Sequence, residues 1–251
     1  MKPAPPVTQT VRDGIRAPLS ARAAADLKPL PRGFYQRDTV TVARDLLGKL
    51  LVRKLPEGLA VVRLTEVEAY LGVADAACHT FSGRRTRRNE TMWGEAGHLY
   101  VYFTYGMHHC ANVVTRAPGV PEAVLLRGAL PLLGEEAMRR RRGGRGGPSM
   151  LDGPAKLCAA LAIDRSLDGV DLTSSREAFL ADDGVVVPDE LVAALPRVGV
   201  GYAGEAARWP LRFVAEAEAW AARRAATDAP RAASARGGGA ARRRGRWAAG
   251  R

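Results

Sequence analysis

Hydrophobic and polar positions alternate with a period of two along several stretches of the chain. The clearest stretch is LAVVRLTEVEAY, residues 59–70, which is rich in β-branched side chains and typical of a strand. HLYVYFTYGMHHCANVVT, residues 98–115, predicts two strands joined by a tight turn at Tyr105 and Gly106. EAVLLRGAL, residues 122–130, predicts another strand. Residues 184–195, 198–204 and 209–220 indicate further strands and a last helix.

Helical signals lie between these stretches. Asp38 is placed as the N-cap of a helix that ends at Gly48 and is followed by a strand. GEEAMRRRR, residues 134–142, predicts a second helix that runs into a glycine-rich loop. Pro154 stands at an early helical position before apolar residues at helical spacing, which predicts a third. Runs of strands with interspersed helices favour an α+β fold with a mainly antiparallel sheet.

Composition divides the chain into three parts. Residues 1–32 are rich in Pro, Ala and Arg and are interpreted as a flexible arm with one short helix at most. Residues 33–220 are expected to form a single compact domain, because 251 residues can bury one sizeable core. Residues 221–251 are interpreted as a disordered tail rich in Arg, Ala and Gly.

The net charge of +12 is concentrated in two segments. The tail from Arg223 onward carries nine arginines and one aspartate, and the RRRRGGRGG segment that starts at Arg139 carries five arginines. Such segments are usually solvated, but they also raise salt-dependent affinity for phosphate backbones. Charge alone therefore admits a nucleic-acid partner without demonstrating one.

The sequence gives no sign of a membrane or of an oxidising compartment. It contains no apolar run of about 18 residues and no secretory signal at its start. The three cysteines, Cys78, Cys110 and Cys158, are too few for a disulfide framework. We expect a soluble intracellular protein, either cytoplasmic in a bacterium or nuclear in a eukaryote.

The stretch TEVEAYLG places two carboxylates near the end of a buried strand. Side chains alternate between the faces of a strand, so Glu66, Glu68 and Tyr70 are expected to share one side with Val62 and Leu64. Two carboxylates about 7 Å apart in a partly desolvated site can supply a general base with a raised pKa. The alternative is that the strand leaves the core here, or that neighbouring arginines pair with the acids.

The predicted hairpin carries aromatic side chains. Tyr100 and Tyr102 share one face of a strand, which is most often ordinary core. Tyr105 lies at the turn, where a large side chain is exposed unless a partner docks against it. A DNA duplex can accept such a wedge, and a displaced base then needs an aromatic pocket.

Several long motifs in order resemble the alkyladenine (3-methyladenine) DNA glycosylase family. They are EVEAYLG, the histidine of AACHTFSGRRTRRN, GHLYVYFTYGM with Asn112 after it, VLLRGALP, GPAKLCAALAI and RVGVGYAGEAARWPLRF. The resemblance covers residues 34–213. It implies a compact α+β domain around a curved antiparallel sheet with a projecting hairpin. It also implies a monomeric, monofunctional enzyme without a cofactor that excises alkylated or deaminated purines from double-stranded DNA.

The resemblance implies a role for particular side chains. Glu68 would activate the attacking water, with Arg127 and the backbone of Val198 also holding that water. Tyr70, His79 and Tyr102 would form the base pocket, and Asn112 would disfavour guanine. Tyr105 would insert into the duplex in place of the extruded nucleotide.

Simpler interpretations stand beside these roles. Cys78, His79, His108, His109 and Cys110 do not have zinc-ligand spacing, so no metal site is expected. Lys156 can bind a phosphate or be a solvated residue of the first helical turn. Arg84, Arg85 and Arg88 face DNA phosphates if the resemblance holds and are otherwise solvated surface. The alternative function is a non-catalytic nucleic-acid-binding module that uses the Tyr105 hairpin and the basic tail.

Overall fold

An antiparallel sheet of eight strands is the framework of the computed structural model, which describes residues 19–215. The strands are β1 (Leu50–Leu55), β2 (Gly58–Tyr70), β3 (Leu99–Thr104), β4 (His108–Thr115), β5 (Glu122–Leu133), β6 (Ala178–Ala181), β7 (Val192–Leu195) and β8 (Arg212–Ala215). Their order is β3-β4-β5-β2-β1-β6, and the β7-β8 pair branches from β2. All of these pairings are antiparallel, which confirms the predicted α+β class.

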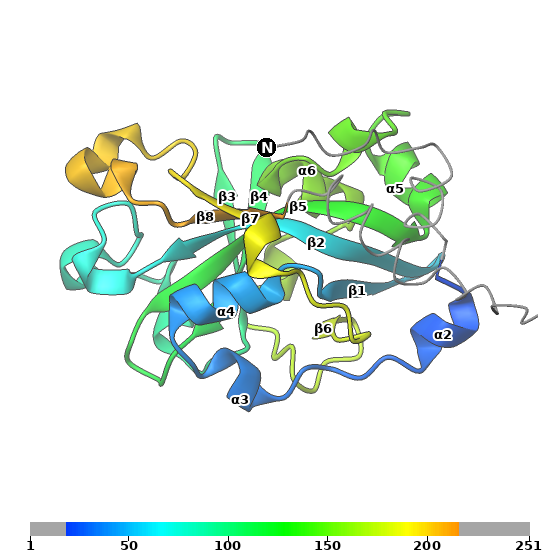
Figure 1. Cartoon of the computed structure of the whole chain (residues 1–251), viewed down its shortest axis with the longest axis horizontal. Helices are drawn as coiled ribbons and strands as arrows, with labels where there is room; N and C mark the ends of the chain where they lie inside the picture. The colour runs from blue at the N-terminus through cyan, green and yellow to red at the C-terminus, as the bar shows by residue number, and fades with distance from the viewer. Residues whose placement is uncertain (1–18, 216–251) are drawn as a thin grey trace, which may run out of the picture.

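Short helices pack around the sheet (Figure 1). The α-helices are α2 (Ala21–Ala25), α3 (Arg32–Tyr35), α4 (Thr39–Leu46), α5 (Glu135–Arg141) and α6 (Pro154–Ala160). The 3-10 helices are η1 (Gly72–Ala74), η2 (Phe81–Gly83), η3 (Glu90–Trp93), η4 (Pro148–Met150), η5 (Arg165–Leu167), η6 (Asp189–Leu191) and η7 (Gly201–Arg208). Figure 1 shows α3 and α4 below the sheet and α5 and α6 above it. Asp38 caps α4 as predicted, because its carboxylate accepts a hydrogen bond from the Thr41 amide at 3.0 Å.

Residues 19–32 pack against the sheet, although the sequence places them in the N-terminal arm. The Leu19 amide donates to the Leu132 carbonyl at 3.0 Å, and Pro29 forms a bridge with Ala181. Ala24 and Leu30 are buried. Small side chains carry little hydrophobic signal, so periodicity does not reveal this packing. The rest of the predicted arm and the predicted C-terminal tail lie outside the described residues.

The predictions for the last third of the chain are partly wrong. Residues 192–195 and 212–215 are strands, but residues 198–204 run through a bend into η7. Gly199 adopts a left-handed backbone conformation with φ 77°, which interrupts a strand. The four-residue strand β6 was not predicted, because so short an apolar run has no distinctive period. The predicted last helix lies outside the described residues.

A bulge interrupts β2 beside the two acids. Leu64 pairs with Ala129, whereas Glu66 pairs with Gly128, so Thr65 has no partner in the register. At the same point β2 changes neighbours, since residues 58–63 pair with β1 and residues 66–68 pair with β8. A bulge re-aims the side chains that follow it. It therefore sets the direction of the acidic end of β2.

The bulge overturns the predicted alternation along β2. Val62 and Leu64 belong to the same core cluster as Val67 and Ala69, which have the opposite parity. Their predicted sharing of a face with Glu66, Glu68 and Tyr70 is therefore wrong. The extra residue at the bulge shifts the inward-facing positions from even to odd numbers, and this shift turns the acids away from the aliphatic core.

Replacing Gly128 with alanine tests the importance of this bulge. A Cβ atom at Gly128 would lie 3.0 Å from the Glu66 Cβ and 3.2 Å from its Oε2. We expect Gly128→Ala to lower the free energy of unfolding by about 1–3 kcal/mol in urea denaturation, because overpacking forces the strands to shift. Gly33→Ala is the control, since a Cβ there meets nothing within 4 Å. Equal stability of both variants would contradict the bulge's role.

Candidate active site

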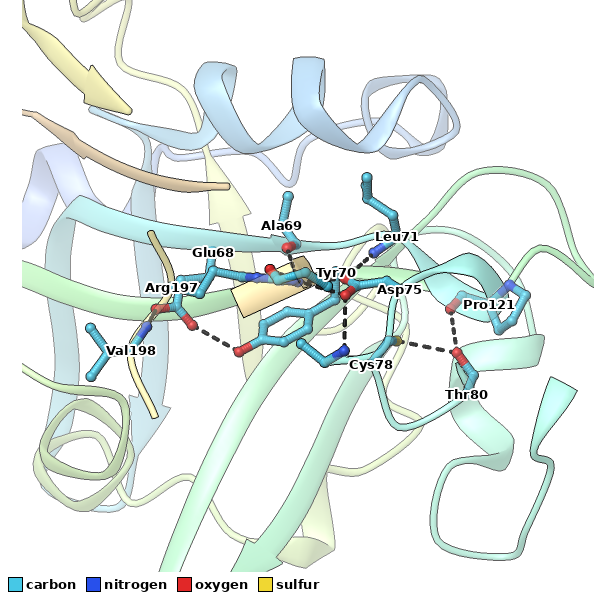
Figure 2. Close-up of polar contacts among 12 residues, drawn as sticks. Glu68, Ala69, Tyr70, Leu71, Asp75, Cys78, Thr80, Pro121, Arg197 and Val198 are labelled. Carbon is cyan, nitrogen blue, oxygen red and sulfur yellow. Dashed lines mark hydrogen bonds and ion pairs between the residues drawn. The ribbon is translucent and has the colours of Figure 1, made fainter. Parts of the chain in front are cut away.

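Glu68 holds a carboxylate inside the protein at the C-terminal end of β2. The residue is 0% exposed. Its Oε1 accepts a hydrogen bond from the Val198 amide at 2.8 Å and lies 3.3 Å from the Arg127 Nη1. Its Oε2 accepts from the Tyr70 hydroxyl at 2.8 Å (Figure 2). A carboxylate offers about four acceptor positions. Two hydrogen bonds and one ion pair therefore leave capacity for one more partner, such as a water molecule.

Burial raises the pKa of Glu68, because a low-dielectric surrounding disfavours the charged form. Arg127, the Val198 amide and the Tyr70 hydroxyl oppose this effect by stabilising the carboxylate. Tyr70 stays protonated, since burial and then the charge of Glu68 raise its pKa. The result is a carboxylate that is more basic than an exposed glutamate, with a tyrosine that donates to it.

Arg127 on β5 lies between the two acids. Its Nε donates to the Glu66 Oε1 at 2.9 Å, and its Nη1 faces Glu68. Arg212 on β8 donates to the same Glu66 oxygen at 3.0 Å. Glu66 therefore braces Arg127, and its charge also contributes to the raised pKa of Glu68. Two guanidinium groups balance two carboxylates in this cluster.

A cavity of about 310 Å³ opens in front of this cluster. Its lining includes the seven residues other than Glu68 to which the resemblance assigns a role: Tyr70, His79, Tyr102, Tyr105, Asn112, Arg127 and Val198. They come from β2, the loop after it, β3, the hairpin turn, β4, β5 and the segment before η7. Glu68 lies behind the lining. The volume is at the lower end of the range of about 300–1,000 Å³ that is usual for small-molecule sites.

His79 forms one wall of the cavity as a neutral imidazole. Its Nδ1 lies 2.9 Å from the Tyr100 hydroxyl, and its ring meets the Tyr102 ring edge-on with centroids 4.5 Å apart. Burial lowers the pKa of His79 to about 4, with further contributions from the charges of Arg88 and Arg84. Because Nδ1 is engaged with Tyr100, the Nε2 atom is the one left for a ligand.

Asn112 and Tyr105 differ in how firmly they are held. The Asn112 side chain is buried and donates to the Tyr100 carbonyl at 3.1 Å. Tyr105 is 83% exposed and stands at the hairpin turn with a positive φ of 51°. A bulky residue rarely adopts this backbone conformation. The turn therefore presents an aromatic ring at the cavity mouth that packs little against the protein itself.

The basic side chains proposed for DNA contact have different surroundings. The Arg84 side chain makes no hydrogen bond or ion pair with another described residue, whereas its backbone carbonyl accepts a hydrogen bond from the Asn89 side chain at 2.9 Å. Arg85 is paired with Glu90. Arg88 donates to the Phe103 carbonyl at 3.0 Å and lies 5.4 Å from the Tyr102 ring centroid. Lys156 donates to Asp152 at 2.6 Å, which favours the solvated interpretation over a phosphate site.

A buried ion pair that the sequence did not reveal ties the site together. Arg197 and Asp75 are both fully buried and form a two-pronged salt bridge, with the Arg197 Nη2 at 2.8 Å from the Asp75 Oδ1. Arg197 also donates to the Ala69 carbonyl at 3.0 Å, and its guanidinium lies 4.7 Å from the Tyr70 ring centroid. Figure 2 shows how this pair joins β2 to the segment that carries Val198.

Asp75 also shapes the loop that carries His79. Its two oxygens accept hydrogen bonds from the amides of Leu71 and Ala77, each at 3.0 Å. The partners Asp75 and Arg197 are 122 residues apart in sequence. No local pattern marks such a pair. The only signal available was that Arg197 falls within a motif already noted and that Asp75 lies between two such motifs.

Two features are absent from residues 19–215. Within this range no group of three or more His, Cys, Asp or Glu side chains gathers as a metal site. The described helices include none that is long and apolar enough to cross a bilayer.

Comparison with known proteins places this chain in the class of DNA glycosylases. The sequence profile of the family described as methylpurine-DNA glycosylase (MPG) matches residues 33–219. The chain belongs to this family. The predicted resemblance is therefore confirmed.

Relatives from several microorganisms share most of the chain. A protein of Methanocella arvoryzae is 49% identical over 185 residues, which cover 73% of this chain and 90% of the relative. One of Bdellovibrio bacteriovorus is 45% identical over 73% of this chain and 93% of the relative. One of Streptomyces avermitilis is 45% identical over 76% and 89%, respectively. Each is named "Putative 3-methyladenine DNA glycosylase".

The titration of His79 tests its placement in the cavity wall. We expect its NMR resonances to show a neutral ring at pH 6 and a midpoint near pH 4, because burial and two arginines disfavour the imidazolium form. The depressed pKa also predicts that its contribution to stability is present above the unfolded pKa of about 6.5 and is lost as the pH falls towards 4. His79→Gln assigns the resonances. A midpoint near 6.5 would show that the ring is solvated.

Proposed function

We propose that this DNA glycosylase hydrolyses the N-glycosidic bond of alkylated or deaminated purines that have been turned out of duplex DNA. The observation that carries the proposal is the buried Glu68 carboxylate behind an aromatic cavity. A carboxylate with one acceptor position left can hold a water molecule and take its proton. Arg127 and the Val198 amide would fix the orientation of that carboxylate.

The proposed step transfers one proton and exchanges one bond. The water oxygen attacks the anomeric carbon while the bond from that carbon to the base nitrogen breaks. The electron pair of the broken bond stays on the base, so a cationic alkylated base leaves neutral and a neutral deaminated base takes a proton from solvent, while the water proton passes to Glu68. A carboxylate near the anomeric carbon also stabilises the oxocarbenium-like charge of the transition state. The products are an abasic sugar and a free base.

The charges around the cavity favour a cationic base. Alkylation at a purine ring nitrogen gives the base a positive charge, which makes it a good leaving group. A neutral His79 does not repel such a base, whereas an imidazolium would. Stacking against Tyr70 and Tyr102 adds cation–π attraction. Asn112, held by the Tyr100 carbonyl, is proposed to crowd the exocyclic amino group of guanine and so to disfavour normal purines.

The exposed Tyr105 ring is proposed to fill the space that the extruded nucleotide leaves in the duplex. Extrusion costs a few kcal/mol of stacking and pairing, and an inserted side chain offsets part of that loss. The turn places Tyr105 on the cavity lining itself. One side chain would therefore occupy the helix while the displaced base occupies the adjacent cavity.

The lining residues also favour a monofunctional enzyme that acts as a monomer. A lyase reaction needs an amine nucleophile. Among the described residues that line the cavity there is no lysine. All of the proposed groups come from one chain. A module that only binds DNA has no use for the Glu68 charge, which repels phosphates and is costly to bury.

Replacing Glu68 with glutamine separates catalysis from binding. The amide is isosteric and keeps an oxygen for the Val198 amide and a nitrogen beside the Tyr70 hydroxyl. We expect Glu68→Gln to bind a duplex with an alkylated purine as wild type does, but to excise the base at least 100-fold more slowly, since a general base contributes roughly 10²–10⁴-fold. Single-turnover excision measures the rate, and Glu177→Gln is the exposed control.

The pH dependence of excision gives a second measure of Glu68. Its carboxylate must be ionised to accept a proton, so the rate should fall as the pH is lowered through its pKa. Burial places that acid limb above the ordinary glutamate pKa of 4.5. Equal excision by wild type and Glu68→Gln would remove Glu68 from the mechanism.

Replacing Tyr105 with serine tests insertion. We expect Tyr105→Ser to weaken binding and excision of a lesion in duplex DNA about tenfold while leaving a lesion in single-stranded DNA unaffected, because only a duplex has a stack to fill. Val186→Ser removes another exposed apolar side chain and serves as the control. An identical loss on both substrates would count against insertion.

A further inference from the structure

A second concave surface lies against the face of β3 that points away from the cavity. It is a groove of about 430 Å³ lined by Arg87, Arg88, Phe103 and Arg165, which we call the arginine groove. Tyr102 lines the cavity, and the next residue, Phe103, lines the groove. Successive side chains of a strand point to opposite faces. One hairpin strand therefore separates the two sites.

Backbone carbonyls of β3 anchor two of the three guanidinium groups of the arginine groove. The Arg165 Nη1 donates to the Val101 carbonyl at 2.8 Å, and Arg88 donates to the Phe103 carbonyl. Asp168 lies 3.3 Å from the Arg165 Nη2 but accepts a hydrogen bond from the Val101 amide, so it faces the strand. Arg87 pairs with no other described residue.

The arginine groove combines positive charge with an apolar ring. Among the described residues, no carboxylate lines it. Phe103 is 45% exposed, and the His109 ring packs against it at a tilt of 47° with centroids 5.0 Å apart. A nucleic-acid backbone matches this chemistry, because its phosphates are anionic and its sugars pack against apolar rings. A small anion would not use the exposed ring, and an apolar peptide would not use the arginines.

We propose that the arginine groove binds the backbone of the DNA strand complementary to the damaged one. The inference rests on the proposed function, in which the damaged strand delivers its base to the cavity on the Tyr102 side of β3. With Tyr105 inserted at the hairpin tip, the two sides of the hairpin face different strands. The groove on the Phe103 side then meets the strand that keeps its bases stacked.

The test is the salt dependence of binding to DNA that carries an abasic-site analogue, which needs no excision. Each phosphate contact contributes about 0.9 to the slope of log affinity against log salt concentration for duplex DNA. We expect Arg87→Gln to lower the slope by about that amount, so that raising the salt from 50 to 200 mM weakens wild type about 3.5-fold more than the variant. Arg87→Gln combined with Arg165→Gln should lower the slope about twice as much.

A single strand that carries the same analogue distinguishes the two strands. It has no complement, so the variants should bind it with the wild-type slope. Arg176→Gln is the matched control, because this exposed arginine precedes β6 at the opposite edge of the sheet from β3. Arg165→Lys keeps the charge, so Arg87→Gln combined with Arg165→Lys should regain most of the slope that the double glutamine variant loses at position 165. Thermal unfolding checks that the double variants are folded.

Each contrary result is distinct. Equal slope changes on single and double strands would assign the arginine groove to the damaged strand, and an unchanged duplex slope would remove DNA from it. Either result would overturn the proposal. Failure of the proposed function would appear differently, as wild-type protein that does not excise an alkylated base, whatever the variants bind.

Discussion

Two hydrogen-bond donors and one guanidinium group hold the buried Glu68 carboxylate, and they come from three segments of the chain. The Tyr70 hydroxyl comes from the same strand, Arg127 from β5 and the Val198 amide from the segment before η7. An isolated buried charge would be neutralised by a proton. The rest of the fold therefore has to bring these three groups to the Glu68 carboxylate and hold them there.

Two features provide that support. The bulge at Thr65 turns Glu66 and Glu68 away from the aliphatic core and towards Arg127. The buried salt bridge between Asp75 and Arg197 fixes the loop before His79 and the backbone next to Val198. Breaking a buried pair leaves an uncompensated charge, which costs about 3–5 kcal/mol. The cavity wall and the carboxylate are thus positioned by the same salt bridge.

The charged groups around the β3–β4 hairpin differ between its two sides. The cavity side presents a neutral histidine, tyrosine rings and a recessed carboxylate, which suit a cationic base. The other side presents Arg87 and Arg165 around Phe103, which suit phosphates. Because neighbouring residues of a strand point in opposite directions, β3 contributes Tyr102 to one surface and Phe103 to the other.

The sequence by itself determined the antiparallel α+β class, the long strands, the hairpin turn and the motifs whose side chains line the cavity. These are local features, or motifs in a fixed order, and they need no knowledge of distant contacts. Tertiary structure alone decided the direction of the Glu68 side chain and the pairing of Arg197 with Asp75. It also decided the packing of residues 19–32 and the placement of Arg87 and Arg165 along one groove. A bulge depends on the register with a partner strand, and an ion pair across 122 residues depends on the folded path of the chain. Neither leaves a periodic trace in one sequence.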